Sequence, residues 1–322
     1  MSKMGVGRCC CGKFVYVTTS SSSQYTKPIG LDDTSWVYVD DPSGSSFGYL
    51  KVAIDYKHSE VYLSKSLTSL YSVTHDYKSP VLLYTQPSGY SIQAQCVDYV
   101  SRRVYFITVG GGDTKIWRID HDGGNITDLY TCSVFSGFQK WTAAHVACRP
   151  EENKIFWIEY ALNTATAQYE YRIRSADLDA AGPTDLLYFS GAYTEQLYDL
   201  VADHENNRIW FTSQKHLPAS PFNESPKIQY CNLDGTGQTT WKTAIDANAI
   251  NHQFININVS RLDGRVHYAV WTYFGAVMDA GDGWYSDTFA QDDLTFISDS
   301  AAGGVQSQNS DIDLGKGYER FG

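Results

Sequence analysis

The sequence predicts an all-β protein, a six-bladed β-propeller with four-stranded antiparallel blades, from three observations. A short strand rich in β-branched and aromatic residues recurs six times, at spacings of 46, 43, 51, 54 and 57 residues. A repeat of this length is typical of propeller blades. The composition agrees, because 43% of the 322 residues are hydrophobic and 14% are aromatic, while only 19% are charged. The third observation is a C-terminal strand that has no partners in its own repeat.

Each copy of the recurring strand is expected to be the second of four strands in a blade. The copies begin at Val15, Val61, Val104, Ile155, Ile209 and Val266. The repeat over 95–130 shows the whole unit, with strands at 95–98, 103–108, 115–120 and 126–130. A tight turn at 121–124 joins its last two strands, and the counterparts of this turn are 178–182 and 233–237. Asp-Gly pairs in these turns favour the positive φ that such hairpins need.

The first strand of the blade repeats as well, except before Val15. The segment 310–314 resembles a first strand without a blade of its own. Joining it to the N-terminal blade would close the ring and remove an exposed edge. We therefore expect an N-terminal arm over 1–12 and a single propeller over 13–322.

The segment "VDYVSRRVYFIT…KIWRIDHDGGN" resembles the YWTD repeats of low-density-lipoprotein-receptor-type six-bladed propellers. In that family an aromatic strand is followed by an LDG turn. The terminal Asp of the family motif is replaced in all six copies, by Thr19, Lys65, Thr108, Glu159, Ser213 and Val270. More distantly, the chain is similar to calcium-dependent lactonase-like propellers. The resemblance implies the fold and leaves both binding and catalysis open.

The charge and the cysteine pattern exclude several classes of partner. A net charge of −11 without a basic run argues against nucleic acid and anionic membranes. Neither a membrane span nor a secretory signal is recognisable in the sequence. Four of the seven cysteines are scattered, which favours buried thiols over a disulfide framework. The consecutive Cys9, Cys10 and Cys11 lie in the arm and are predicted to serve assembly.

Aromatic residues gather in the connections of one propeller face. Connections between second and third strands lengthen at 161–170, 213–226 and 272–283, and 131–144 joins two blades. Long loops on a rigid scaffold often carry function, and exposed aromatics are typical of recognition surfaces. The predicted binding face comprises Tyr90, Phe135, Phe138, Trp141, Tyr169, Tyr193, Phe222, Tyr273, Phe274 and Trp284. The alternative is that several of them cover the blades as packing residues.

Polar residues recur at a fixed position of the first strands, where the strands should converge on the channel. The six positions hold Lys51, Ala94, His145, Asp199, Asn256 and Asn309. Oxygen and imidazole ligands from His145, Asp199, Asn256 and Asn309 would suit a cation such as calcium. The alternative is a wet channel mouth, where polar residues are expected.

We predict a non-enzymatic binding or assembly module without a cofactor, whose partner is a protein or another virion subunit. The composition and the arm favour a phage or viral virion component, such as a spike, decoration or receptor-binding protein. One alternative is a lactonase-like hydrolase in which calcium polarises a carbonyl and Asp199 or His145 is the base. Another is a propeller that binds cell-surface glycans through the same aromatics.

Overall fold

The computed structural model of the chain describes residues 15–17, 27–29, 49–55, 57–58, 60–65, 68–74, 80–133, 136–191, 195–203, 205–215, 226–243, 252–259, 265–272, 283–291, 295–299 and 312–314. Within these residues the strands form five four-stranded sheets and one three-stranded sheet, and every pairing is antiparallel. Side chains are described through most of four sheets. The predicted all-β propeller with four-stranded antiparallel blades is confirmed, whereas the number of six blades stays a prediction.

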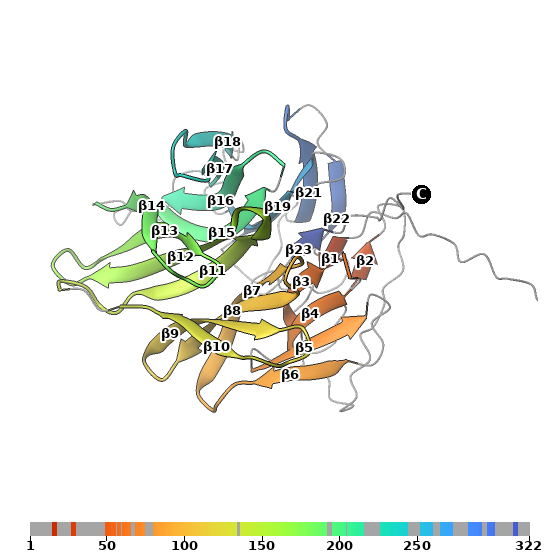
Figure 1. The fold of residues 1–322 in the computed structure, drawn as a ribbon. Coiled ribbons are helices and arrows are strands. Elements are labelled where there is room, and N and C mark those ends of the chain that lie inside the picture. Colours follow the sequence, from red (N-terminus) through yellow and green to blue (C-terminus); the bar gives the residue numbers. More distant parts are fainter. Residues whose placement is uncertain are drawn as a thin grey trace, which may run out of the picture.

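In each four-stranded sheet, neighbours in sequence are neighbours in space (Figure 1). The first of these sheets contains β3 (Tyr49–Asp55), β4 (Glu60–Lys65), β5 (Ser69–Thr74) and β6 (Val81–Thr85). The second contains β7 (Tyr90–Asp98), β8 (Arg103–Gly110), β9 (Asp113–Asp120) and β10 (Thr127–Thr131). The third contains β11 (Thr142–Arg149), β12 (Lys154–Asn163), β13 (Gln168–Asp177) and β14 (Thr184–Phe189). The fourth contains β15 (Glu195–Asp203), β16 (Arg208–Lys215), β17 (Lys227–Asn232) and β18 (Thr239–Thr243), and the fifth contains β19 (His252–Val259), β20 (Arg265–Thr272), β21 (Gly283–Thr288) and β22 (Thr295–Asp299).

The three-stranded sheet joins the two ends of the chain. It orders β2 (Lys27–Ile29), β1 (Val15–Val17) and β23 (Ile312–Leu314). Val15 pairs with Leu314 and Val17 with Ile312, which is the pairing of the C-terminal strand that the sequence predicts. The first strands β3, β7, β11, β15 and β19 contact one another in chain order, and β23 contacts both β19 and β3.

The hydrophobic core is divided into layers between successive sheets. Trp157 and Ile155 of β12 pack against Tyr105 and Ile107 of β8, and all four side chains are fully buried. On the other side of the same sheet, Phe156 packs among residues of β15 and β16. Alternate side chains of β12 therefore pack into two different core layers. Each fully buried large side chain stabilises the fold by roughly 1.5–3 kcal/mol.

Aspartates that end the first strands close the turns to the second strands. Asp98 Oδ1 accepts the N–H groups of Val100 and Ser101 at 2.8 and 2.9 Å. Asp203 Oδ1 accepts those of Glu205 and Asn206 at 3.0 and 3.1 Å. The third sheet has Arg149 at this position, and a 3-10 helix, Pro150–Glu152, replaces the turn. Where an aspartate ends the first strand, its carboxylate thus accepts local backbone N–H groups and shapes the turn.

Both edge strands of the four-stranded sheets carry a β-bulge at a constant place. On the first strands the pairing register shifts immediately before Lys51, Ala94, His145, Asp199 and Asn256. On the fourth strands the shift passes over a large apolar residue: Leu83, Leu129, Leu186, Trp241 or Ile297. Bulges re-aim neighbouring groups and raise the local twist.

Tight turns of one sheet pack against the bulges on the fourth strand of a neighbouring sheet. A Cβ added to Gly235 would lie 2.4 Å from Leu186 O, and one added to Gly123 would lie 3.2 Å from Leu83 O. Trp241 Nε1 donates a 2.9 Å hydrogen bond to Phe289 O, in the turn after β21. The turns predicted from the sequence therefore form part of the contact between neighbouring sheets.

Candidate functional site

The two ends of the propeller differ in the residues they expose. We call one the loop end and define it as residues 68, 85–90, 110–113, 131–133, 136–141, 163–169, 189–191, 195, 215, 226–227 and 243. It holds the described connections from second to third strands and from one sheet to the next. The other is the turn end, defined as residues 57–58, 99–102, 121–126, 150–153, 178–183, 205–207, 233–238 and 289–291, where the remaining turns lie.

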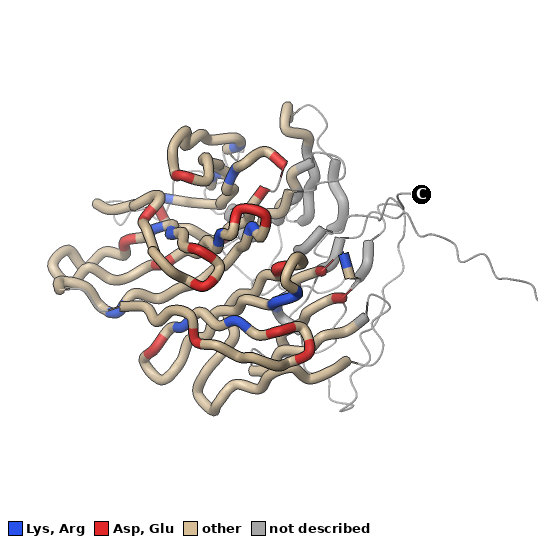
Figure 2. The backbone as a smooth tube through the Cα atoms, in the orientation of Figure 1, with Lys and Arg blue, Asp and Glu red and all other residues tan. Residues whose placement is uncertain are grey.

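The β12–β13 hairpin is the prominent element of the loop end. Its ladder runs from Lys154↔Asp177 to Asn163↔Gln168, whereas β11 pairs with β12 only as far as Thr142↔Tyr160. The hairpin thus continues past its neighbouring strand, and its end is drawn without charged residues (Figure 2). Asn163 Oδ1 accepts the N–H of Ala165 at 2.9 Å and thereby shapes the turn.

The connection over 136–141 is fastened to two neighbouring hairpins. Gln139 N donates to Leu162 O at 2.8 Å, and Thr164 N donates to Gly137 O at 2.9 Å. Lys140 forms an ion pair with Asp113, which lies in the hairpin of the preceding sheet. This ion pair and hydrogen bond hold the pKa of the Asp113 carboxyl below its ordinary value. The connection is therefore a fixed part of the surface.

Tyrosines flank the end of the hairpin on both faces of the sheet. Tyr169 is 50% exposed, and its ring lies edge-on to Tyr160 with centroids 6.0 Å apart. On the opposite face Tyr188 is also 50% exposed, and its ring centroid is 6.5 Å from that of Trp141. The Tyr188 hydroxyl donates to Glu170, and burial together with this carboxylate raises the pKa of Tyr188 to about 12. Both tyrosines thus present partly covered rings in fixed positions.

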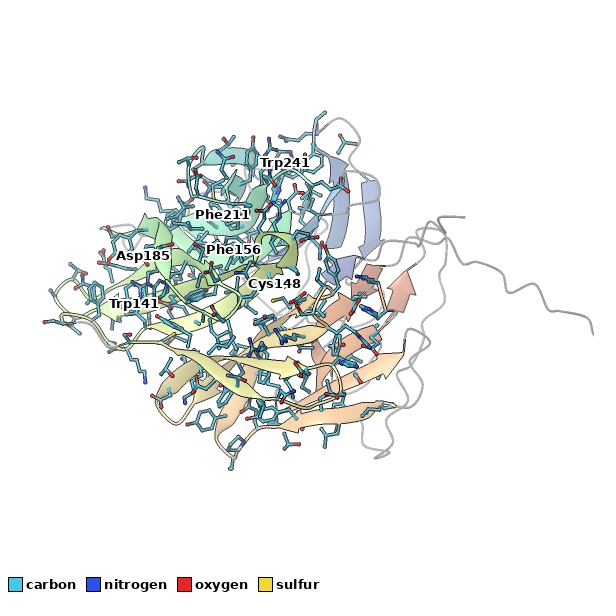
Figure 3. The ribbon with its side chains drawn as sticks, viewed as in Figure 1. Trp141, Cys148, Phe156, Asp185, Phe211 and Trp241 are labelled. Atoms are coloured by element: carbon cyan, nitrogen blue, oxygen red, sulfur yellow. The ribbon has the colours of Figure 1, made fainter. Side chains whose placement is uncertain are left out.

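Trp141 lies beneath this surface and packs against the residues that form it (Figure 3). Its side chain is only 2% exposed, so it belongs to the core. Phe138 packs on it at a centroid distance of 5.5 Å, and the Arg172 guanidinium lies 4.1 Å from its ring. A cation held over an indole face in a buried place is attractive. The position of the 136–141 connection therefore depends on Arg172.

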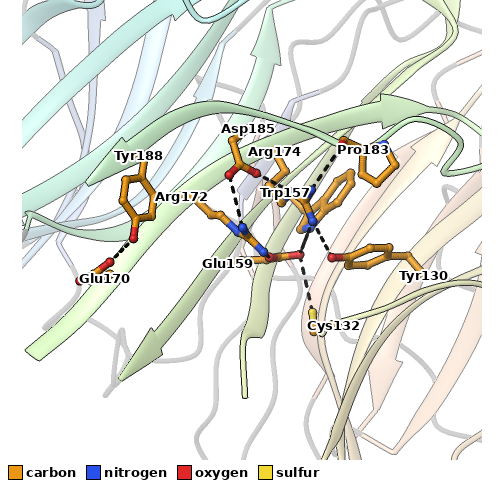
Figure 4. A network of polar contacts seen from close by, with 10 residues as sticks. All are labelled: Tyr130, Cys132, Trp157, Glu159, Glu170, Arg172, Arg174, Pro183, Asp185 and Tyr188. Atoms are coloured by element: carbon orange, nitrogen blue, oxygen red, sulfur yellow. Dashed lines mark hydrogen bonds and ion pairs between the residues drawn. The ribbon is translucent and has the colours of Figure 1, made fainter. Parts of the chain in front are cut away.

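A buried polar network orients Arg172 (Figure 4). Glu159, which has no exposed surface, accepts hydrogen bonds from Arg172 Nε at 2.8 Å and from Trp157 Nε1 at 2.7 Å. Arg172 also lies 3.3 Å from Asp185, and Arg174 pairs with the same aspartate at 2.8 Å. Burial alone would lower the pKa of Arg172, but the charge and hydrogen bonds of Glu159, together with the charge of Asp185, outweigh it and raise the pKa. Two carboxylates thus compensate two guanidinium groups between two sheets.

The polar ring predicted at the channel is partly described. His145 Nδ1 of β11 lies 3.1 Å from Asp199 Oδ1 of β15. Asp199 Oδ1 also accepts the N–H of Leu200 at 2.8 Å, and Oδ2 accepts the N–H of Ile257 in β19 at 2.7 Å. One carboxylate therefore connects three successive first strands. Among the described residues no group of three His, Cys, Asp or Glu side chains is placed to hold a metal.

Several predicted site residues lie outside the described residues. Of the aromatic face these are Phe135, Tyr193, Phe222, Tyr273 and Phe274, and of the polar ring and the arm they are Asn309, Cys9, Cys10 and Cys11. Trp284 and Asn256 lie in β21 and β19, but their side chains are not described. Tyr90 begins β7 and is partly buried.

The sequence gives little sign of Tyr188, Glu159 and Arg172, which the structure brings to the site. Glu159 stands where the YWTD motif has its terminal Asp, and this departure is the one available signal. Thr108 and Ser213 occupy the same place, and both are buried and hydrogen-bonded, to Trp117 Nε1 at 2.9 Å and Gln229 Nε2 at 2.7 Å. A buried polar anchor is thus common to these three sheets.

Comparison with known proteins shows the fold. No protein-family model matches the chain, and no curated protein matches its sequence. A chain of the nidogen–laminin complex matches with a TM-score of 0.61 and 11% identity, over 94% of this chain and 98% of that chain. This match is a YWTD-type propeller, in agreement with the resemblance in the sequence.

Two further structures match at lower similarity. An oligogalacturonate lyase in complex with manganese has a TM-score of 0.52 and 12% identity, over 89% of this chain and 72% of that chain. TolB from Acinetobacter baumannii has a TM-score of 0.52 and 12% identity, over 85% of this chain and 66% of that chain. At these identities the likeness concerns the propeller fold alone. Among the described residues, no helix has the length and hydropathy of a membrane span.

Proposed function

We propose that this protein is a non-enzymatic binding module whose loop end holds a protein partner. The observation that carries the proposal is the projecting β12–β13 hairpin, flanked by the half-exposed Tyr169 and Tyr188. Tyrosine provides large, rigid contact area at a low entropic cost. The buried network under Trp141 keeps this area ordered before binding, which reduces the cost of association.

Site-directed photo-crosslinking tests the proposal. A photoreactive phenylalanine analogue replaces Tyr169 in the full chain, and the matched control carries it at Glu152, which is exposed at the turn end. In an extract of the source organism, we expect a protein adduct from position 169 that excess unmodified chain suppresses. Adducts from position 152 alone, or no protein adduct at either position, would contradict the proposal.

The proposal includes a ring of six blades in which β2, β1 and β23 form the closing blade. It is supported by the pairing of β1 with β23 and by the contacts of β23 with both β19 and β3. Truncation after residue 309 removes β23, and we expect it to lower the urea midpoint of the whole ring. An unchanged midpoint would argue against closure by this strand.

The assignment to a virion stays a prediction from composition and from the arm over 1–12. It requires that Cys9, Cys10 and Cys11 contact a neighbouring subunit. Crosslinking from position 10 to a second chain in purified particles is the expected result, and an arm without such a contact would contradict it.

A metal-dependent hydrolase is the second candidate, favoured by the 3.1 Å approach of His145 to Asp199. The fit to calcium is partial. Three groups already approach the Asp199 carboxylate, and calcium takes about six to eight oxygen ligands. Asn256 and Asn309 would have to supply further oxygens. Elemental analysis of the wild-type chain and of Asp199→Asn decides, because equal calcium contents in the two would exclude this site.

A further inference from the structure

The exposed surface of the loop end carries no charge in its described part. Every exposed residue there is Gly, Ser, Thr, Ala, Pro, Gln or Tyr. The tip of the β12–β13 hairpin illustrates this, since the residues from Thr164 to Ala167 are all exposed and all uncharged. In a chain with a net charge of −11, an uncharged end of this extent needs a physical reason.

The charged residues nearest to the loop end are partnered within the protein. Lys140 pairs with Asp113, and Lys227 lies 3.5 Å from Glu195; all four residues are partly buried. The buried Glu170 accepts hydrogen bonds from Tyr188 and, at 2.8 Å, from Asn163 Nδ2. Charges at this end are therefore neutralised or hydrogen-bonded internally, and none of these is offered to a partner.

The turn end has the opposite character. Its exposed charged residues are one lysine and six acidic residues: Lys57, Asp122, Glu151, Glu152, Asp179, Glu205 and Asp234. Figure 2 shows acidic residues on these turns. The described propeller is thus a disc with an acidic end and an uncharged end, and electrostatic complementarity to the two ends requires different partners.

We propose that the loop end docks an uncharged protein surface, so that binding there does not depend on ionic strength. This inference rests on the proposed function and specifies the chemistry of its partner. A charged group buried against this end would lose its hydration without gaining an opposite charge, which makes such a contact unfavourable. A protein surface suits the projecting hairpin better than a sugar does, because Tyr160 and Trp141 partly cover the tyrosine rings on which a sugar would stack.

Peptide display on the full chain tests this proposal. Random twelve-residue peptides are selected on the immobilised wild type and counter-screened on Thr166→Lys, which places a charge on the exposed hairpin tip. Ser101→Lys is the matched control, because it adds the same charge at an exposed position of the turn end.

We expect enriched peptides without net charge that bind Thr166→Lys about tenfold more weakly and Ser101→Lys unchanged, because a charge buried against a neutral surface is unpaired. Their Kd should change less than about twofold between 50 and 500 mM NaCl, since neutral contacts are not screened. Cationic peptides that weaken with salt, or that lose affinity for Ser101→Lys, would overturn the proposal. So would a selection without enriched peptides, or neutral oligosaccharides bound in a glycan array where peptides are not.

The failure of this inference differs from that of the proposed function. If no protein crosslinks at position 169, the proposed function is wrong. If a protein crosslinks there but its affinity falls about tenfold with salt, binding at this end stands and the neutral partner surface is refuted.

Discussion

A methyl group added to Gly235 is expected to destabilise the propeller more than the same group added to Gly123. Both glycines occupy the left-handed region, with φ of +83° and +87°. They differ in what the new Cβ would meet, which is Leu186 O at 2.4 Å for Gly235 and Leu83 O at 3.2 Å for Gly123. The pair therefore separates backbone strain from a steric clash between sheets.

The magnitudes follow from these two terms. A residue with a Cβ costs roughly 1–2 kcal/mol in the left-handed region, and Gly→Ala recovers about 0.4–1 kcal/mol from the unfolded chain. We therefore expect Gly123→Ala to cost about 1 kcal/mol. At Gly235 the clash with a backbone carbonyl adds roughly 1–3 kcal/mol, which brings the expected loss to about 2–4 kcal/mol.

The third sheet supplies an internal control, because Ala180 holds the corresponding turn position with a φ of 61°. Ala180→Gly relieves about 1–2 kcal/mol of strain but loses the rigidity of alanine and a buried methyl worth about 0.8 kcal/mol. The net change should be close to zero.

Urea unfolding followed by tryptophan fluorescence measures all three variants, with m values compared to confirm that the unfolding transition is the same. A Gly235→Ala variant within about 0.5 kcal/mol of wild type, the range of ordinary surface substitutions, would refute the reasoning. The same holds if Gly123→Ala costs as much as Gly235→Ala.

Three further predictions concern the buried network, a thiol and the loop end. Glu159→Gln should lower the free energy of unfolding by about 3–5 kcal/mol, because it leaves the buried Arg172 partly unpaired; a loss below about 1 kcal/mol would contradict this. Burial, followed by the nearby Asp234 charge, raises the pKa of Cys231 to about 12, so mass spectrometry should find it unmodified by iodoacetamide at pH 8 in the folded chain and modified in urea, whereas rapid modification of the folded chain would refute it. Because the pKa of Asp113 is lowered by Lys140, its stabilising contribution is present above the ordinary aspartate pKa of about 3.9 and is lost as pH falls through the lower folded value. Wild type and Asp113→Asn should therefore differ in amide exchange over 136–140 at neutral pH and converge in acid, and a constant difference would argue against the pairing.

Much of the fold could be predicted from local patterns. The aromatic strand repeats because every blade needs one fully buried strand between two layers, as Ile155, Phe156 and Trp157 show. The tight turns were recognisable because each turn needs a residue with positive φ, which the Gly or Ala after the Asp provides. This requirement arises within about five residues of the chain. The segment 310–314, a first strand without a blade of its own, was predicted to pair with the N-terminal strand, and Ile312–Leu314 does so.

The candidate site was less accessible to such reasoning. Trp141 was predicted on the binding face, but its exposure depends on Arg172, which comes from another strand and covers its ring. Tyr188 gave no periodic signal, because the groups that fix its ring, Glu170 and Trp141, come from other parts of the chain. The position of His145 relative to Asp199 was predicted from a shared offset, whereas the bulge before each residue became apparent only in the pairing register.

The sequence by itself determined the all-β propeller class, the antiparallel four-strand repeat and the place of its turns, since these depend on interactions between near neighbours in the chain. Only the tertiary structure decided which charges are neutralised. Glu159 meets Arg172 across two strands, and Lys140 meets Asp113 across two sheets. These pairings leave the described part of one end uncharged and the other acidic, because the sum of charges at a surface depends on which side chains the fold brings together.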